Sequence, residues 1–194
     1  MTVRLAIEDD RERVSRLLAR AFADDPAMAH IWPDPAARAR GLPRLFRLLF
    51  DADDRAGMRL VTAGGEAATL WRGPGRARSG RLDLIRKVVP LALAFGTAFG
   101  RAMAVSGAID AHMPAGDFWY LHIAGCDPAR QGRGFGHAAI QAGLDRAAGR
   151  LPCYLETANP ANLGFYRALG FAVTDEWRGG GDGPTFWSML RPPG

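Results

Sequence analysis

The sequence predicts a mixed α/β fold with a central sheet of about seven strands, because short apolar strands and amphipathic helices alternate along the chain. Two parts of the sequence favour this class most strongly. Residues 58–62 and 67–71 flank a Gly-Gly turn in the pattern of an antiparallel hairpin. Residues 117–128 are rich in aromatic and apolar residues and end at Asp-Pro, as a central strand does, and a glycine-rich turn and a helical segment at 135–150 follow.

The N-terminal half begins with a short strand and two helices. Residues 3–6 alternate as in a strand, and residues 8–22 place Val14, Leu17, Leu18 and Ala21 at helical spacing. Three prolines interrupt residues 23–35, which predicts a loop or broken turn there. Residues 36–50 then resume the helical period. The hairpin comes next along the chain.

The C-terminal half continues with helices and strands in turn. Residues 82–105 have a helical pattern, but Pro90 and two glycines predict a kink or a division into two helices. After the central strand and the helix at 135–150, the predicted elements are a strand at 153–157, a short helix at 162–169 and strands at 171–177 and 185–190.

Length and composition are those of a soluble globular protein, and we expect one domain over residues 1–194. The net charge of +5 would suit a polyanion, but the arginines are spread among acidic residues, so we expect no nucleic acid partner. Two cysteines, with no histidine or cysteine at metal-ligand spacing, predict no metal and a cytoplasmic location. The most apolar stretch, residues 88–100, is shorter than the roughly 20 residues that span a membrane, so we expect no membrane partner.

The turn within ARQGRGFGHAAI, residues 129–140, has the properties of an anion site. Gly132, Gly134 and Gly136 let the backbone approach a ligand closely, and the start of a helix offers unpaired N–H groups to a phosphate. The spacing matches neither a dinucleotide-binding fingerprint nor a P-loop. The side chains expected to assist in phosphate binding are Arg130, Gln131 and Arg133.

Two signatures carry a resemblance to a known family. LHIAGCDPARQGRGFGHAAI (121–140) resembles the acetyl-CoA-binding segment of the GNAT superfamily of N-acetyltransferases. LETANPANLGFYRALGF (155–171) resembles the second signature of that family, in the expected order and at the expected distance. Residues 118–190 are most similar to puromycin N-acetyltransferase-like members, whereas the first 115 residues resemble the family only in the order of their elements.

The resemblance implies a sheet that splits between its fourth and fifth strands, so that the pantetheine arm of acetyl-CoA lies in the gap. The backbone of the fourth strand would pair with pantetheine, and the pyrophosphate would rest on the amides of the glycine-rich turn. Acetyl-CoA is then the co-substrate, with no metal. The implied cofactor-binding residues are Ala124, Gly125, Cys126, Arg130, Gln131, Gly132, Arg133, Gly134, Phe135, Gly136, His137, Asn162 and Tyr166.

The resemblance also implies direct attack of a substrate amine on the acetyl thioester. Tyr166 matches the family's proton donor to the leaving thiolate, with core packing as the alternative. Glu156 is the first candidate for the general base and His122 the second; the alternatives are that Glu156 orients the amine or pairs with an arginine, and that His122 is a core residue. Asn162 either contacts the cofactor or caps a helix.

The acceptor is expected to be a small-molecule amine, although a fold and a cofactor site do not fix its identity. A non-catalytic CoA-binding sensor or scaffold module is the alternative function, and the resemblance leaves homodimer formation open. Core packing is the alternative for the two tryptophans in the acceptor set, and a capping turn is the alternative for the two aspartates. The residues expected to line the acceptor site are Asp24, Asp25, His30, Trp32 and Trp187.

Overall fold

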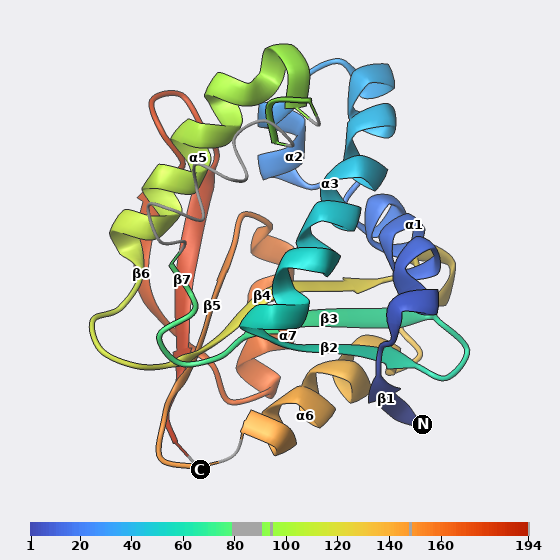
Figure 1. The fold of residues 1–194 in the computed structure, drawn as a ribbon. Coiled ribbons are helices and arrows are strands. Elements are labelled where there is room, and N and C mark those ends of the chain that lie inside the picture. Colours follow the sequence, from blue (N-terminus) through green and yellow to red (C-terminus); the bar gives the residue numbers. More distant parts are fainter. Residues whose placement is uncertain (79–90, 94, 148, 194) are drawn as a thin grey trace.

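The computed structural model of this chain describes residues 1–78, 91–93, 95–147 and 149–193. A seven-stranded sheet with the strand order β1-β2-β3-β4-β5-β7-β6 forms its centre (Figure 1). The strands are β1 (Val3–Leu5), β2 (Gly57–Thr62), β3 (Ala67–Arg72), β4 (Trp119–Cys126), β5 (Cys153–Thr157), β6 (Ala172–Arg178) and β7 (Thr185–Arg191). The helices are α1 (Arg11–Ala21), α2 (Pro26–Ile31), α3 (Pro35–Ala56), α5 (Phe99–His112), α6 (Phe135–Ala147) and α7 (Leu163–Ala168). The predicted mixed α/β class is confirmed.

Helices cover both faces of the sheet, and each face has its own apolar core. On one face, Leu18 of α1 and Phe46 of α3 pack in one cluster with Leu70 of β3. On the other face, Ile140 of α6 packs in one cluster with Leu121 of β4. Figure 1 shows α1, α2, α3 and α5 on one side of the sheet and α6 on the opposite side. Burial of both faces accounts for the near-continuous apolar character of the central strands.

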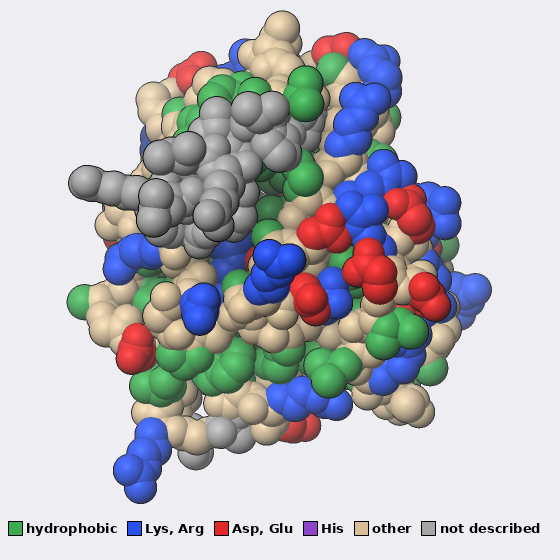
Figure 2. All heavy atoms as spheres, in the orientation of Figure 1, with side chains coloured by type: hydrophobic (Ala, Val, Ile, Leu, Met, Phe, Trp, Pro, Cys, Tyr) green, Lys and Arg blue, Asp and Glu red, His purple; other side chains and the backbone are tan. Residues whose placement is uncertain are grey.

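Charged side chains of both signs are mixed over α1 and α3 on the face seen in Figure 2. Arg11 and Asp51 form an ion pair of 2.5 Å between these helices, and Arg47 and Glu12 form another of 2.6 Å. On this face the basic residues thus lie among acidic ones, as their spread along the sequence led us to expect.

The sheet splits between β4 and β5, as predicted. These two strands are parallel and pair only at Trp119 with Cys153 and at Tyr120 with Tyr154. Beyond Tyr120 the strands diverge, while β4 stays paired with β3 as far as Cys126. One edge of the second half of β4 is therefore not used by β5.

Some boundaries differ from the predictions. The predicted loop at 23–35 contains helix α2, because the carboxylate of Asp25 accepts hydrogen bonds from the amides of Ala27 (2.9 Å) and Met28 (3.1 Å), and Pro26 suits the first helical turn. Helix α3 continues beyond the predicted end at residue 50 to Ala56. Of the helical segment predicted at 82–105, residues 82–90 and 94 lie outside the described residues.

Two glycines allow helices to pack closely on the sheet. A Cβ on Gly143 of α6 would overlap the indole of Trp71, which is fully buried on β3. A Cβ on Gly125 of β4 would lie 2.6 Å from Cδ2 of Leu18, on α1. Both glycines are therefore required by packing.

We expect Gly143→Ala to lower the free energy of unfolding by about 1–3 kcal/mol, because the added methyl group overpacks a rigid core. Gly107→Ala is the matched control, since Gly107 is also helical and a Cβ there meets nothing within 4 Å. That substitution should raise stability by about 0.5–1 kcal/mol. Urea denaturation of both variants measures the difference, and equal effects would contradict the packing role of Gly143.

Candidate active site

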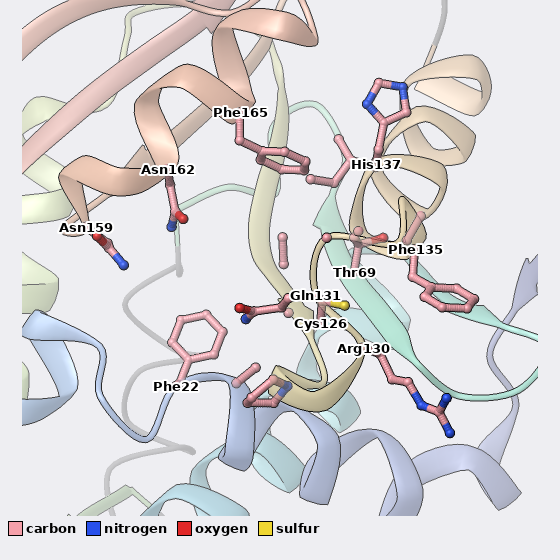
Figure 3. Close-up of a pocket in the computed structure, with 18 of the residues that line it drawn as sticks. Phe22, Thr69, Cys126, Arg130, Gln131, Phe135, His137, Asn159, Asn162 and Phe165 are labelled. Carbon is pink, nitrogen blue, oxygen red and sulfur yellow. The ribbon is translucent and has the colours of Figure 1, made fainter.

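A cavity of about 670 Å³ lies beside the second half of β4. The end of β4, the glycine-rich turn, the first turn of α6, the end of α1 and helix α7 all line it. Figure 3 shows Phe22, Gln131 and Phe165 reaching this cavity from three segments that are distant in the sequence. We call it the first cavity.

The backbone of the turn explains two of its three glycines. Gly132 and Gly134 have φ of +74° and +82°, in the left-handed region that favours glycine. A Cβ on Gly132 would meet no protein atom within 4 Å, and one on Gly134 would meet only Met1 Cε, at 3.7 Å. The conformation of the chain, rather than crowding by the protein, therefore requires glycine at these two positions.

The turn is anchored at its start by Asp127. Its carboxylate accepts a hydrogen bond of 3.0 Å from the amide of Ala129 and forms an ion pair of 2.7 Å with Arg20 of α1. The hydrogen bond to Arg20 lowers the pKa of Asp127, so this carboxylate stays ionised at neutral pH. Helix α6 begins at Phe135, and the first amides of a helix have no partner within it. The turn thus presents N–H groups beside the first cavity.

Most of the implied cofactor-binding residues line the first cavity. Arg133 is the exception: it is exposed and lies outside the lining, so the structure does not bring it to this site. Residues of the lining that sequence reasoning missed include Arg20, Phe22, Thr69, Asn159 and Phe165. Those implied residues that do line it are Ala124, Gly125, Cys126, Arg130, Gln131, Gly132, Gly134, Phe135, Gly136, His137, Asn162 and Tyr166.

A second cavity of about 230 Å³ adjoins the first. The two share the wall residues Phe22, Asp25, Ala124, Asn162 and Tyr166. Glu156 and His122, the two candidate bases, line the second cavity and not the first. Tyr166 therefore stands where the glycine-rich site and the candidate bases meet.

Glu156 has one oxygen engaged and one without a protein partner. The hydroxyl of Tyr120 on β4 donates a short hydrogen bond to Oε1, across the split from β5. Oε2 is buried and accepts no hydrogen bond from any residue that the structure describes. Burial, opposed by the hydrogen bond from Tyr120, raises the pKa of Glu156 to about 7. A carboxyl with this pKa exchanges a proton readily at neutral pH.

His122 is held by a buried ionic network that sequence reasoning missed. Its Nδ1 lies 2.6 Å from Oδ2 of Asp53, whose Oδ1 accepts a hydrogen bond of 2.7 Å from Nε of Arg72. Asp53 is fully buried at the end of α3. Burial raises its pKa, but the charges of His122 and Arg72 outweigh burial and leave the pKa below its usual value. Asp53 therefore remains ionised and fixes the ring of His122.

Tyr166 and Phe165 are neighbours that face different surroundings. Tyr166 is 8% exposed and packs in the core cluster beneath α6, whereas Phe165 is 38% exposed at the rim of the first cavity. Burial raises the pKa of Tyr166, and Glu156 and Asp25 add to the effect. The phenol is thus protonated at neutral pH and is available as a proton donor.

Asn162 lines both cavities, and its side chain does not cap α7. Its Nδ2 instead donates a hydrogen bond of 3.4 Å to Oγ1 of Thr157. Capping at this point falls to Asn159, which accepts from the amide of Ala161 at 3.0 Å. Asn162 is therefore not explained by helix capping.

The residues expected to line the acceptor site fall into two groups. Asp25 lines both cavities and Asp24 lines the first. His30, Trp32 and Trp187 line neither cavity.

Each of these three side chains has an evident place elsewhere. Trp32 is 4% exposed, because its indole stacks on Phe95 and packs against Gly41 of α3. Nε1 of Trp187 donates to Oε2 of Glu176 at 2.9 Å on the exposed side of β6 and β7. His30 is half-buried on α2.

In the part of the chain that the structure describes, no helix combines the length and apolar character needed to cross a membrane. No set of three or more His, Cys, Asp and Glu side chains there is grouped so as to hold a metal ion.

Comparisons with known proteins agree with this arrangement. Residues 95–171 match the model of the acetyltransferase (GNAT) family. A mycothiol acetyltransferase of Mycobacteroides abscessus is 46% identical over 57 residues, which cover 27% of this chain and 19% of that protein. Another, from Rhodococcus erythropolis, is 40% identical over 67 residues, covering 31% of this chain and 22% of that protein. The matched region thus spans about a fifth of the length of these curated relatives.

Solved acetyltransferase structures share the whole fold. A structure described as histone acetyltransferase HPA2 and related acetyltransferase, from Corynebacterium glutamicum, has a TM-score of 0.72 at 24% identity and covers 100% of this chain and 96% of that one. A polyamine N-acetyltransferase of Drosophila melanogaster has a TM-score of 0.60 at 16% identity, covering 98% and 99%. At these identities the likeness concerns the fold. Residues 95–171 thus resemble the GNAT acetyltransferase family, and the split sheet and the solved structures show that the chain has the fold of these acetyltransferases.

Proposed function

We propose that this protein is an acetyl-CoA-dependent N-acetyltransferase that acts, as one domain over residues 1–194, on a primary amine of a small molecule. The observation that carries the proposal is the meeting of two cavities at Tyr166, one beside the glycine-rich turn and one holding Glu156. The names of the relatives, mycothiol acetyltransferases and polyamine and agmatine N-acetyltransferases, support acetyl transfer to small molecules. Kinship with puromycin N-acetyltransferase-like members and a cytoplasmic location stay predictions.

The first cavity suits coenzyme A. Residues 124–126 pair with β3 on one edge, and their other edge faces the opening left by β5, where the amides of pantetheine can add as a further strand. The N–H groups at the start of α6 suit the pyrophosphate, and Arg130 adds positive charge to the same lining.

The second cavity suits the amine and its proton. An alkylammonium has a pKa near 10.4, so its deprotonation at pH 7 costs about 4–5 kcal/mol. Glu156 accepts this proton at Oε2, and the neutral amine then attacks the thioester carbonyl. As the new C–N bond forms, the C–S bond of the thioester breaks; Tyr166 donates its proton to the leaving thiolate, and the acylated nitrogen returns a proton to Tyr166. His122, held by Asp53, remains the second candidate base.

A non-catalytic CoA-binding module is the alternative proposal. It would use the first cavity in the same way but would have no use for a buried carboxylate and phenol at the junction of the cavities. Turnover separates the two functions, because only the enzyme releases free thiol from acetyl-CoA when an amine is added.

We expect acetyl-CoA at 100 times its Kd to stabilise the protein by about 2.7 kcal/mol, measured by thermal unfolding. Gly134→Val should abolish most of this gain, because the side chain strains the turn that holds the pyrophosphate. Gly75→Ala is the matched control: Gly75 also has positive φ, +69°, but lies outside both cavities. Gly75→Ala should lower the free energy of unfolding and leave the stabilisation by acetyl-CoA intact.

For Glu156→Gln, we expect kcat to fall by about 10²–10⁴-fold, since the amide cannot accept the ammonium proton. In the unmodified protein, kcat/KM should rise with pH and level off above the pKa of about 7. The Glu156→Gln variant should lose this rise of kcat/KM with pH. The release of free thiol across a pH series measures the profile. If the variant keeps the rise of kcat/KM with pH, the rise belongs to another ionisable group, and His122 is the next residue to test.

The pH dependence of the free energy of unfolding supplies a control for Glu156→Gln. The pKa of Glu156 is raised from 4.5 to about 7 on folding, so its stabilising contribution is complete below about pH 4.5 and is lost as the pH rises through 7. We therefore expect Glu156→Gln to lose less stability than the unmodified protein between pH 5 and 8. A variant that unfolds in this range would not report on catalysis.

We expect Tyr166→Phe to lower kcat by about 10²-fold or more and to change the Kd for acetyl-CoA little, because only the proton donor is removed. Tyr154→Phe is the control, since Tyr154 is also buried, shares a hydrogen bond of 2.9 Å with Ser188, and lines neither cavity. Single-turnover kinetics with each variant make the comparison. An unchanged rate for Tyr166→Phe would remove Tyr166 from this role.

A further inference from the structure

The second cavity borders the apolar core that α1, α3, α5 and the sheet form among the described residues. Several half-buried apolar side chains pack against the core formed by α1, α3, α5 and the sheet. Those that also line the second cavity are Phe22, Met28, Leu49, Phe95, Ile109 and Ile123. They come from both sides of the cavity, on the helices and on β4, so an apolar group placed between them would be removed from water on more than one side.

Acidic side chains outnumber basic ones among the described residues that line the same cavity. The acidic residues that line it are Asp25, Asp110 and Glu156, and the basic ones are Arg72 and His122. The charge of Arg72 is already met by Asp53, outside the lining, at 2.7 Å. Oε2 of Glu156, buried and without a partner among the described residues, is free to accept a hydrogen bond. The lining therefore favours one cation close to the split in the sheet.

The volume limits the size of the apolar group. A cavity of about 150 Å³ lined by apolar side chains holds benzene. The second cavity measures about 230 Å³. It accommodates one ring together with a linker of one or two carbons that leads to the amine.

We propose that the acceptor is a primary monoamine with an apolar substituent about the size of one ring, held with its ammonium group at Glu156 and its substituent among Met28, Leu49 and Ile109. This rests on the proposed function, because it names the substrate class of the same site. A second ammonium group placed among Met28, Leu49 and Ile109 would lie unpaired against apolar side chains, so diamines that extend along this wall are disfavoured. Two solved structures that share the fold are named as arylalkylamine N-acetyltransferases, whereas the polyamine and agmatine N-acetyltransferases are named for other amines.

The test compares three amines with the full chain and acetyl-CoA: 2-phenylethylamine, 1,4-diaminobutane and 2-aminoethanol. We expect kcat/KM for 2-phenylethylamine to exceed that for each of the others by about tenfold or more, because only its ring fills the apolar wall. Thiol release measures the rate, and mass spectrometry identifies the N-acetyl product. A higher kcat/KM for 1,4-diaminobutane would overturn the proposal.

Leu49→Asp tests whether the apolar wall sets the preference between 2-phenylethylamine and 1,4-diaminobutane. A carboxylate on the apolar wall should lower kcat/KM for 2-phenylethylamine and raise it for 1,4-diaminobutane, which shifts their ratio by about tenfold. Leu5→Asp is the control, since Leu5 is 54% exposed on β1 and lines neither cavity, and the ratio should not change. If Leu49→Asp fails to fold, Leu49→Ala should still lower the rate for 2-phenylethylamine and leave that for 2-aminoethanol unchanged.

Failure of the substrate class differs from failure of the enzyme assignment. If acetyl-CoA gives no thermal stabilisation and no amine releases thiol, the proposed function itself fails. If acetyl-CoA binds and 1,4-diaminobutane or 2-aminoethanol is the best substrate, only the monoamine proposal fails. Stabilisation by acetyl-CoA without acetylation of any of the three amines also counts against the monoamine proposal and favours the non-catalytic module.

Discussion

The divergence of β4 from β5 after two paired positions is the constraint on which the rest of the site depends. It leaves one edge of β4 facing the first cavity while the other edge stays tied to β3. It also opens the space that Tyr120 and Glu156 bridge from opposite strands. If the two strands stayed paired to their ends, neither the edge of β4 nor the free oxygen of Glu156 would be accessible.

The opened sheet is held in place by contacts on both of its faces. On one face, the buried Asp53 joins α3 to β3 through Arg72 and to β4 through His122. On the other face, Gly143 lets α6 rest directly on the indole of Trp71. The groups beside the split are therefore fixed by rigid elements, which keeps a catalytic arrangement preorganised.

How well the site could be predicted from the sequence depended on how local the signal was. The glycine-rich turn and its placement before α6 follow from residues 127–140 alone, and the structure brings nearly all of that segment to one cavity. The partnership of Asp53 with His122 joins positions 69 apart, and that of Tyr120 with Glu156 joins positions 36 apart. These two pairings depend on where α3 ends and on the register of the strands. No local sequence pattern encodes either of these.

Side chains that suit two environments were harder to assign from the sequence. The indole of Trp32 fits a ligand site or a core equally well, and only the space above Gly41 decides for the core. Arg133 stands in the middle of the turn, yet the left-handed glycines on either side leave it outside the cavity.

The wall that the two cavities share has a consequence for the acyl donor. Ala124, Asn162 and Tyr166 border both cavities, so in the proposed complex the thioester end of one ligand and the amine of the other meet at these three residues. Each carbon added to the acyl chain beyond acetyl would occupy room that the acceptor needs. A longer acyl chain on the donor therefore leaves less room for the acceptor. A bulkier acceptor likewise leaves less room for the acyl chain.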